Sequence, residues 1–226
     1  MRLPGSRRGA AAAFADAGRP DVSTPWREGS WCALDLELTG LNPRQDAIIA
    51  VGAVPVEDGR LILGKALYTL ARTSRRSEHG AVLVHKLRVA DLADAPPIED
   101  VVERMLEVLV GRVPVFHTAA VERAFLRPLL RRHWLRLPDA ADTEVLGRLW
   151  LRQRDGDAPA GLALATLAQV LRLPAESPHH ALGDALTTAK AFIALASHLD
   201  AREPQTIGSL VHPAGSVDAS RRFGPA

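Results

Sequence analysis

Two acidic residues, Asp35 and Glu37, stand two positions apart in an otherwise apolar segment. Side chains alternate across a β-strand, so both carboxylates are expected on one face while the neighbouring leucines take the other. The same alternation is typical of any half-exposed strand, and by itself it does not indicate a site. The segment leads directly into Gly40, which permits a sharp turn with positive φ. The two acids are therefore expected at the end of a strand beside a loop, where functional sites are commonly built.

A third acid, Glu122, falls on the apolar side of an expected helix. It shares an i, i+3, i+4, i+7 stripe with Phe125, Leu126 and Leu129. Burying an unpaired carboxylate costs on the order of several kcal/mol, so Glu122 must be protonated, paired with a base or bound to a cation. The alternative is that Glu122 is simply an acid in the first turn of the helix, where it suits the helix dipole.

The opposite side of the same helix carries Arg123, Arg127 and Arg131 in an i, i+4, i+8 row. Such a row is typical of a solvated helix face, and a stripe that contacts phosphates is the alternative. The pattern alone does not decide between them.

A fourth acid, Asp184, follows two adjacent histidines, His179 and His180, near the start of another expected helix. Asp184 shares a partly apolar face with Thr188, four residues later, so we expect it to be half buried. The histidines could be ordinary loop residues. The alternative is that they bring a titratable imidazole close to the acid.

These four acids lie on elements that could converge. Four carboxylates cannot all be ionised side by side without compensating charge. Hard divalent cations such as Mg²⁺ or Mn²⁺ suit an all-oxygen site, and two of them about 3.5 to 4 Å apart can clamp the attacking and leaving oxygens of phosphodiester hydrolysis. Zinc is disfavoured because the single Cys32 and the spacing of the histidines match no zinc-ligand pattern. The pattern therefore predicts a site for two divalent cations.

The elements that must position these residues form a run of strands followed by alternating helices and strands. Apolar, partly β-branched stretches predict three antiparallel strands at residues 31–38, 47–56 and 60–70. The later elements are predicted as a helix from residue 98, a strand at 113–116, a helix from 119, a strand near 138–141, and helices from 142, near 164–171 and at 182–199. The expected fold is α/β, a mixed five-stranded sheet flanked by helices.

The composition indicates one sizeable domain with appendages. The chain has 226 residues, of which 47% are hydrophobic and 24% charged, as is typical of a soluble globular protein. We expect a disordered N-terminal arm at residues 1–28, the functional domain at 29–200 and a flexible C-terminal tail at 201–226. No apolar run is long enough for a membrane span or a secretory signal, and the lone cysteine fits a reducing compartment. We therefore expect a cytoplasmic protein that has no membrane partner.

The charge balance gives no direct argument for a nucleic-acid partner. The net charge is +2, and outside the two termini residues 31–200 hold 20 basic and 21 acidic residues. A nucleic-acid partner would require a local basic patch, or a metal that masks the acids.

The chain carries three motifs, at residues 35–41, 115–126 and 179–185, and together they make it resemble the DEDDh 3′–5′ exonucleases, the family of the proofreading epsilon subunit of bacterial replicative DNA polymerase and its free-standing relatives. The stretch Asp35-Leu-Glu37-Leu-Thr39-Gly40-Leu41 is similar to the first motif, Asp-x-Glu-x-Thr-Gly-Leu. The stretch His179-His-Ala-Leu-Gly-Asp184-Ala is similar to the third motif, His-x-Ala-Leu-x-Asp-Ala. Residues 115–126 are similar to the second, His-Asn-x-x-Phe-Asp followed by Phe-Leu, with Thr118, Val121 and Glu122 in place of the usual Asn, Phe and Asp.

The resemblance implies a ribonuclease-H-like fold and a metal-dependent exonuclease that uses two divalent cations, Mg²⁺ or Mn²⁺. The substrate would be the 3′ end of single-stranded DNA, and the product a nucleoside 5′-monophosphate. It also implies a role in repair or replication proofreading, alone or within a polymerase or repair complex. The implied site residues are Asp35, Glu37, Glu122 and Asp184 as metal ligands, His179 as the base that deprotonates the attacking water, and Thr39, Leu41 and His85 as substrate contacts.

Two alternatives stay open at this stage. One is a nucleic-acid-binding or scaffold relative whose site is weakened by the change at Glu122. The other is an exoribonuclease that acts on RNA 3′ ends, because DNA and RNA are discriminated through contacts to the 2′-hydroxyl, which motifs do not reveal.

Overall fold

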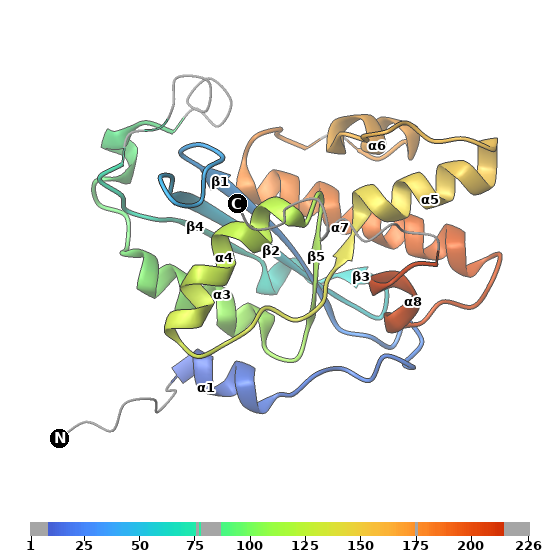
Figure 1. The fold of residues 1–226 in the computed structure, drawn as a ribbon, viewed down its shortest axis with the longest axis horizontal. Helices are drawn as coiled ribbons and strands as arrows, with labels where there is room; N and C mark the ends of the chain where they lie inside the picture. The colour runs from blue at the N-terminus through green and yellow to red at the C-terminus, as the bar shows by residue number, and fades with distance from the viewer. Residues whose placement is uncertain (1–8, 76, 78–86, 175, 215–226) are drawn as a thin grey trace.

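A computed structural model describes residues 9–75, 77, 87–174 and 176–214. The chain folds around one mixed sheet with helices on both faces (Figure 1). The strands are β1 (Trp31–Leu38), β2 (Ile48–Glu57), β3 (Arg60–Leu61), β4 (Leu67–Leu70), β5 (Val113–Phe116) and β6 (Ala141–Asp142). The helices are α1 (Gly9–Asp16), α3 (Ile98–Leu109), α4 (Ala120–Arg132), α5 (Thr143–Asp155), α6 (Leu164–Val170), α7 (Ala181–Asp200) and α8 (Ile207–Val211), with 3-10 turns η1 (Leu63–Lys65) and η2 (Val89–Leu92).

The sheet has six strands in the order β3-β2-β1-β5-β6, with β4 also paired to β2. Strand β1 is antiparallel to β2 and parallel to β5, and β5 is parallel to β6. The prediction of a mixed sheet flanked by helices is confirmed, but the number of strands differs from the five expected. Residues 60–70 do not form one strand because the single turn η1, which contains Gly64, interrupts the pairing. Glycine weakens a strand, and here it marks the break between β3 and β4.

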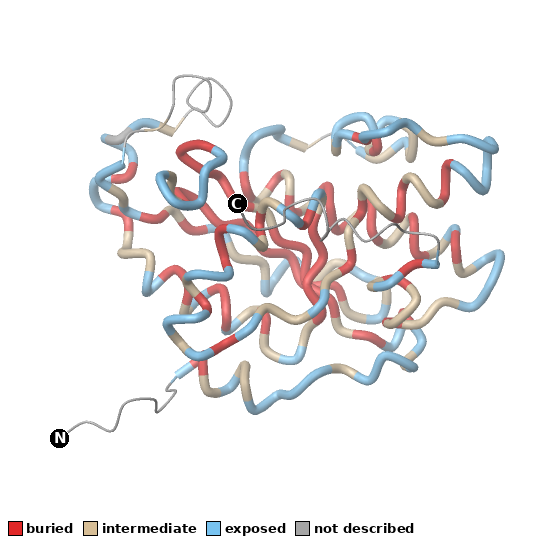
Figure 2. The backbone as a smooth tube through the Cα atoms, in the orientation of Figure 1, coloured by how far each residue is buried: buried red, intermediate tan, exposed pale blue. Residues whose placement is uncertain are grey.

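Each face of the sheet is covered by its own helices. Helices α5, α6, α7 and α8 pack against the face that carries Trp31 and Ala33 of β1. Helices α1, α3 and α4 pack against the face that carries the leucines of β1, including Leu34. The tube coloured by burial shows the buried strands running between the two layers (Figure 2). A sheet buried on both faces explains why the central strands consist of nearly continuous apolar runs.

Helix α7 approaches the sheet closely at Gly52 of β2. A Cβ atom at this position would lie only 2.1 Å from the carbonyl oxygen of Ala181, the first residue of α7. Gly52 is also the partner of Asp35 in the β1–β2 ladder. The glycine therefore lets the start of α7 sit directly over the strand position that carries the first acid.

The segments before and after the expected domain are ordered where the structure describes them, which corrects the prediction of unstructured tails for residues 9–28 and 201–214. Helix α1 packs on α3 and buries Ala10 and Ala11. Trp26 is buried, and its carbonyl accepts a hydrogen bond from Trp31 Nε1 at 2.8 Å. Residues 1–8 and 215–226 lie outside the described part of the chain.

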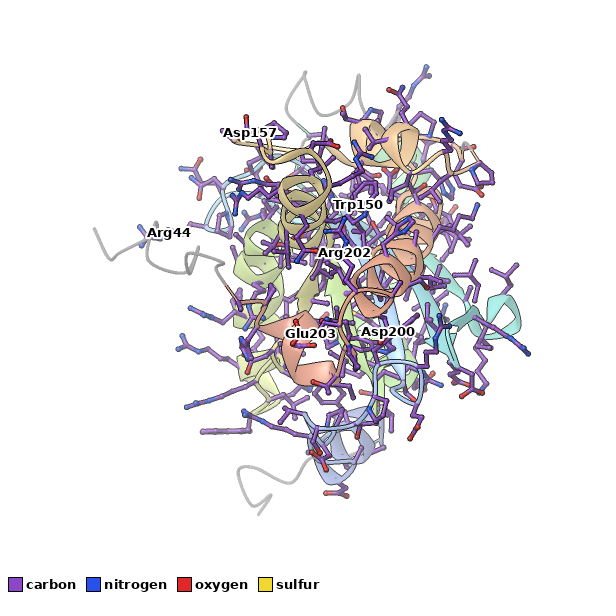
Figure 3. All side chains as sticks on the ribbon, turned by 90° about the vertical axis from the view of Figure 1, so that its right-hand side faces the viewer. Arg44, Trp150, Asp157, Asp200, Arg202 and Glu203 are labelled. Atoms are coloured by element: carbon purple, nitrogen blue, oxygen red, sulfur yellow. The ribbon has the colours of Figure 1, made fainter. Side chains whose placement is uncertain are left out.

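The C-terminal segment is tied to the helical layer and to the N-terminal segment. The guanidinium of Arg202, a residue labelled in Figure 3, donates to the carbonyl of Gln153 in α5 at 2.8 Å. Thr206 forms an isolated β-bridge with Pro25, and α8 buries Ile207. Isolated apolar residues in polar, proline-containing segments gave no periodic signal, because their packing partners lie far away in the sequence.

Two smaller findings concern the apolar parts of the chain. Cys32 is fully buried, and burial raises the pKa of its thiol to about 12. Among the helices of the described ranges, none combines the length and the apolar character that a bilayer crossing requires.

Candidate active site

Three of the predicted acids meet in space. Asp35 and Glu37 of β1 and Asp184 of α7 each offer a carboxylate oxygen, and these oxygens lie within 4.8 Å of one another. The strand period places the first two on the same face of β1, and the close approach of α7 at Gly52 brings Asp184 to them. We call Asp35, Glu37 and Asp184 the three-acid group.

Asp184 is held by the loop that precedes α7. Its Oδ2 accepts a hydrogen bond from the backbone N–H of His179 at 2.9 Å, and its own N–H donates to the carbonyl of His180 at 2.9 Å. His179 has a φ of 58°, a conformation that residues other than glycine rarely adopt. Such local strain clusters at functional sites, where the surrounding contacts maintain it.

Burial and mutual repulsion make the three-acid group reluctant to ionise. Burial raises the pKa of Asp35 well above its usual value, and the charges of Asp184, Glu37 and Glu122 raise it further. Burial, with the charge of Asp184, raises the pKa of Glu37 to about 7. The pKa of Asp184 is also raised by burial, against the hydrogen bond from His179. Such a group gains most from a cation, and its all-oxygen donor set suits Mg²⁺ or Mn²⁺.

Glu122 lies near this group but outside it. As predicted, its side chain is buried on the apolar face of α4, with 7% exposure, together with Phe125 and Leu126. Its Oε2 has no hydrogen-bond partner among the described residues. Burial raises the pKa of Glu122 to about 8, and the charge of Asp142 adds to this effect. An orphaned, buried carboxylate oxygen, on a residue whose charge acts on Asp35, is compatible with a cation as its missing partner.

The loop that precedes α4 is tied to the start of α5 by one carboxylate, that of Asp142. Its Oδ1 accepts hydrogen bonds from the backbone N–H groups of Glu144 at 2.9 Å and Val145 at 3.5 Å, and so caps α5. The same carboxylate accepts from the N–H groups of Thr118 at 3.2 Å and Ala119 at 2.9 Å. Asp142 therefore fixes the two residues immediately before α4, the helix that carries Glu122.

Two neighbouring contacts strengthen this connection. The hydroxyl of Thr118 donates to Glu144 Oε2 at 3.0 Å, and His117 Nδ1 lies 2.9 Å from the hydroxyl of Thr143. Thr118 has a φ of 62°, which is strained for a β-branched residue. The sequence pattern marks residue 142 only as the start of a helix. Its second role, holding the loop before α4, could be predicted only from the pairing of β6 with β5.

The β1–β2 loop places the two predicted nucleotide contacts very differently. Thr39 is fully buried, and its hydroxyl donates to Asp46 Oδ1 at 3.0 Å and accepts from the N–H of Ala47 at 3.0 Å. Its side chain therefore shapes the loop. Leu41, in contrast, is 76% exposed. The third predicted contact, His85, lies outside the described residues.

The two histidines before α7 also differ. Both are exposed, but the ring of His180 is stacked on that of Tyr68 from β4, with centroids 4.4 Å apart and planes 24° apart. Tyr68 pairs with Gly52 in the sheet, so it belongs to the same row across the strands as Asp35. Sequence analysis missed Tyr68, because only the strand register brings it to this loop. The stack holds the residue next to His179 in place.

Comparisons with known proteins agree with the motifs. Residues 32–192 match the exonuclease family known as RNase T. The chain is 33% identical over 193 residues to the DNA polymerase III subunit epsilon-like protein of Rhodobacter capsulatus, a match that covers 84% of the chain and 27% of that relative. The chain therefore spans about a quarter of the length of this relative.

Two solved structures share the fold. Exonuclease X in complex with 5′ overhanging duplex DNA has a TM-score of 0.59 and 23% identity, and the match covers 80% of the chain and 99% of that protein. Escherichia coli exonuclease I in complex with a dT13 oligonucleotide has a TM-score of 0.64 and 15% identity, and the match covers 77% of the chain and 42% of that protein.

Proposed function

Because the chain belongs to the exonuclease family, we propose that it is a metal-dependent 3′–5′ exonuclease that hydrolyses single-stranded DNA to nucleoside 5′-monophosphates. The observation that carries the proposal is the three-acid group, in which carboxylate oxygens of one buried and two half-buried residues lie within 4.8 Å of one another. Buried carboxylates gathered so closely destabilise the fold unless a cation compensates them. This arrangement disfavours the alternative of a binding or scaffold protein, which has no need for such a cluster.

The acids would hold two divalent cations, Mg²⁺ or Mn²⁺. Asp35, Glu37 and Asp184 supply one set of oxygens, and the orphaned oxygen of Glu122 is the candidate for a further ligand. When bound, such cations stabilise negative charge on the attacking and leaving oxygens of a phosphodiester. Glu122 lies outside the three-acid group, and this position suits a ligand of the second cation.

His179 would act as the general base. It is exposed, next to the residues that bind the cations, and would accept the proton of the attacking water at an imidazole nitrogen. Its backbone N–H already holds the Asp184 carboxylate. His180 is less suited to this role, because its ring is stacked on Tyr68.

The DNA strand would approach over the β1–β2 loop. The exposed side chain of Leu41 offers an apolar contact for the terminal base, and Thr39 supports the loop from below. Support for DNA as the substrate comes from the relatives, which are named as a polymerase III epsilon-like protein and as exonucleases in complex with DNA. Cytoplasmic repair or replication, with or without a polymerase, is the setting that fits this activity.

The decisive experiment is the incubation of purified protein with 5′-labelled single-stranded DNA in Mg²⁺, Mn²⁺ or EDTA. The proposal predicts a ladder that shortens from the 3′ end only with metal. Matched RNA oligomers, assayed in parallel, test the exoribonuclease alternative. No degradation of either nucleic acid with any metal would refute the proposal.

A further inference from the structure

The C-terminal end of α4 closes with an unusual residue. Leu135 N–H donates to the carbonyl of Leu130, and Trp134 N–H donates to the carbonyl of Arg131. These two bonds, with both leucines buried, form a Schellman motif. The position between the last helical turn and Leu135 requires the left-handed conformation, which is usually left to glycine. Here Trp134 occupies it with a φ of 58°.

Two features make Trp134 unexpected at this position. A bulky residue is strained at this φ, and α5 ends instead on Gly156 with a φ of 84°. In addition, the Trp134 side chain is 70% exposed, although its large apolar surface favours burial. A glycine would close α4 equally well. The closure of α4 therefore does not explain the tryptophan, and the explanation must lie in what its exposed side chain binds.

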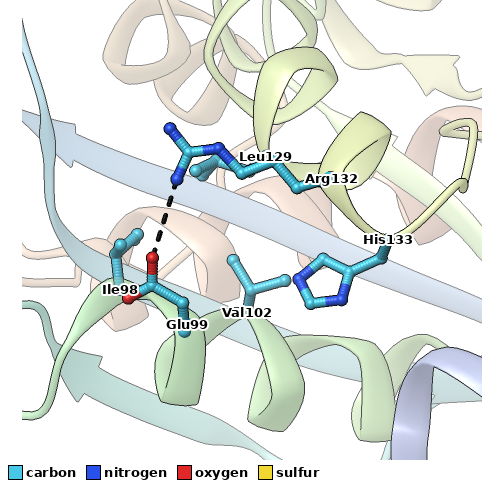
Figure 4. Close-up of a pocket in the computed structure, with 6 residues that line it drawn as sticks. All are labelled: Ile98, Glu99, Val102, Leu129, Arg132 and His133. Carbon is cyan, nitrogen blue, oxygen red and sulfur yellow. Dashed lines mark ion pairs between the residues drawn. The ribbon is translucent and has the colours of Figure 1, made fainter. Parts of the chain in front are cut away.

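The surroundings of Trp134 are strongly basic. Residues 127–136 contain four arginines and one histidine and no acid, whereas residues 31–200 as a whole are nearly neutral. Arg132 is engaged with Glu99 across the groove between α3 and α4, at 3.6 Å (Figure 4). Arg127, Arg131 and Arg136 are exposed, and in the described ranges of the chain none of the three forms an ion pair.

The helix dipole accounts for only part of this charge. Basic residues in the last turn suit the C-terminal end of a helix, which covers Arg131 and Arg132. It does not account for Arg136, which lies beyond the helix, or for an exposed tryptophan among the arginines. Basic side chains interleaved with an exposed aromatic ring are the combination that binds single-stranded nucleic acid, by phosphate contacts and base stacking.

The same helix connects this surface to the candidate active site. Glu122 lies in the first turn of α4 and Arg131 in the last, and nine residues of helix span about 14 Å. If the 3′ end of a strand lies at the acids, the nucleotides that reach the far end of α4 are those on the 5′ side of the terminal nucleotide.

We propose that Trp134, with Arg127, Arg131 and Arg136, forms a binding surface for the single-stranded nucleic acid upstream of the terminal nucleotide. The indole ring stacks on a base, and the guanidinium groups contact phosphates. The inference rests on the proposed function, because it assigns the upstream part of the same substrate.

The test compares Trp134→Ala and Trp134→Gly with wild type on labelled single-stranded DNA of about four and about twenty nucleotides, lengths that bracket typical single-strand site sizes. Removing one base-stacking ring should weaken binding of the long strand by roughly five- to a hundredfold. Turnover of the short strand should be unchanged. Trp134→Gly should melt at the same or a higher temperature, because the strain of a bulky residue at a positive φ is removed. A purely structural residue would not combine higher stability with weaker binding.

The arginines are tested by salt dependence. Arg131→Ala with Arg136→Ala should reduce the slope of log K against log salt by about 0.7 for each phosphate that the variant no longer neutralises. Arg152→Ala, an exposed arginine of α5, is the control for the removal of an arginine elsewhere on the surface and should leave the slope near wild type.

The outcomes separate this inference from the proposed function. If wild type degrades DNA but the Trp134 variants bind the long strand normally, the surface is refuted and the activity stands. If no variant or wild type degrades DNA, yet long-strand binding falls in the Trp134 variants, the activity is refuted and the surface stands. Unchanged DNA binding together with weaker self-association in sedimentation would assign Trp134 to a protein contact and overturn the proposal.

Discussion

Replacing Glu122 by glutamine should leave the folded protein equally or less stable at acid pH and should make it more stable at alkaline pH. The folded protein raises the pKa of this carboxyl from 4.5 to about 8, chiefly by burial. Because the pKa is raised, wild-type stability is greatest below about pH 4.5 and declines as pH rises through about 8. Glutamine keeps the shape of the side chain and removes the charge. The metal-free variant should therefore lose this component of the pH dependence.

The size of the effect follows from the pKa shift. A rise from 4.5 to about 8 corresponds to roughly 5 kcal/mol at a pH above both values, since one pKa unit is about 1.4 kcal/mol. Against this, a buried amide without partners costs about 1 to 3 kcal/mol. In EDTA, Glu122→Gln should be equal to or less stable than wild type near pH 5, and about 2 to 4 kcal/mol more stable near pH 9. For a chain of this size, the gain corresponds to a rise in melting temperature of roughly 5 to 15 °C.

The assay is thermal and urea unfolding of wild type and Glu122→Gln in EDTA across this pH range. Glu107→Gln, on the exposed face of α3, is the matched control and should run parallel to wild type. Other acids with a raised pKa also make wild-type stability depend on pH. The difference between the wild-type and Glu122→Gln curves therefore isolates the contribution of Glu122. Parallel curves for wild type and Glu122→Gln would refute the assignment of a buried, uncompensated carboxylate.

Metal provides the second half of the same test. If the acids hold the proposed cations, Mn²⁺ should bind the folded state and restore wild-type stability at high pH. The variant lacks one of the proposed ligands and should gain less stability, with lower metal affinity and lower nuclease activity. An equal gain in wild type and variant would remove Glu122 from the metal site.

The remaining predictions concern the base, its support, the strained loop and the acids together. His179→Ala should lower turnover by roughly 10²- to 10⁴-fold with little change in DNA binding, and an unchanged turnover would exclude it as the base. Tyr68→Ala removes the stack on the neighbouring His180 and should lower turnover by about three- to tenfold at constant KM, measured in steady state. Thr118→Asn should raise the melting temperature by a few degrees, because asparagine tolerates the left-handed conformation better, and a lower temperature would contradict the strain at this residue. The apparent affinity for Mn²⁺, followed by calorimetry, should increase between about pH 6 and 8, because cations displace protons from Glu37, whose pKa is about 7, and a flat profile would contradict that shift.

Much of the local structure and chemistry could be predicted from the sequence. The alternation along β1 places Asp35 and Glu37 together, and the apolar stripe of α4 predicts a buried Glu122. The capping residue Asp142 marks the start of α5. These features depend on the strand period of two, the helix period of 3.6 and local hydrogen bonds. The three motifs are also local stretches of sequence, so they indicated the family without any knowledge of tertiary contacts.

Only the tertiary structure decided which of these residues meet. It places Asp184 with the two strand acids through the close contact at Gly52, and it leaves Glu122 outside the group with an orphaned oxygen. Sheet register brings Tyr68 against His180, and the parallel β5–β6 pair lets Asp142 hold the loop before α4. Such contacts join residues far apart in the chain. They are set by how strands pair and helices pack rather than by any local period, so a single sequence does not reveal them.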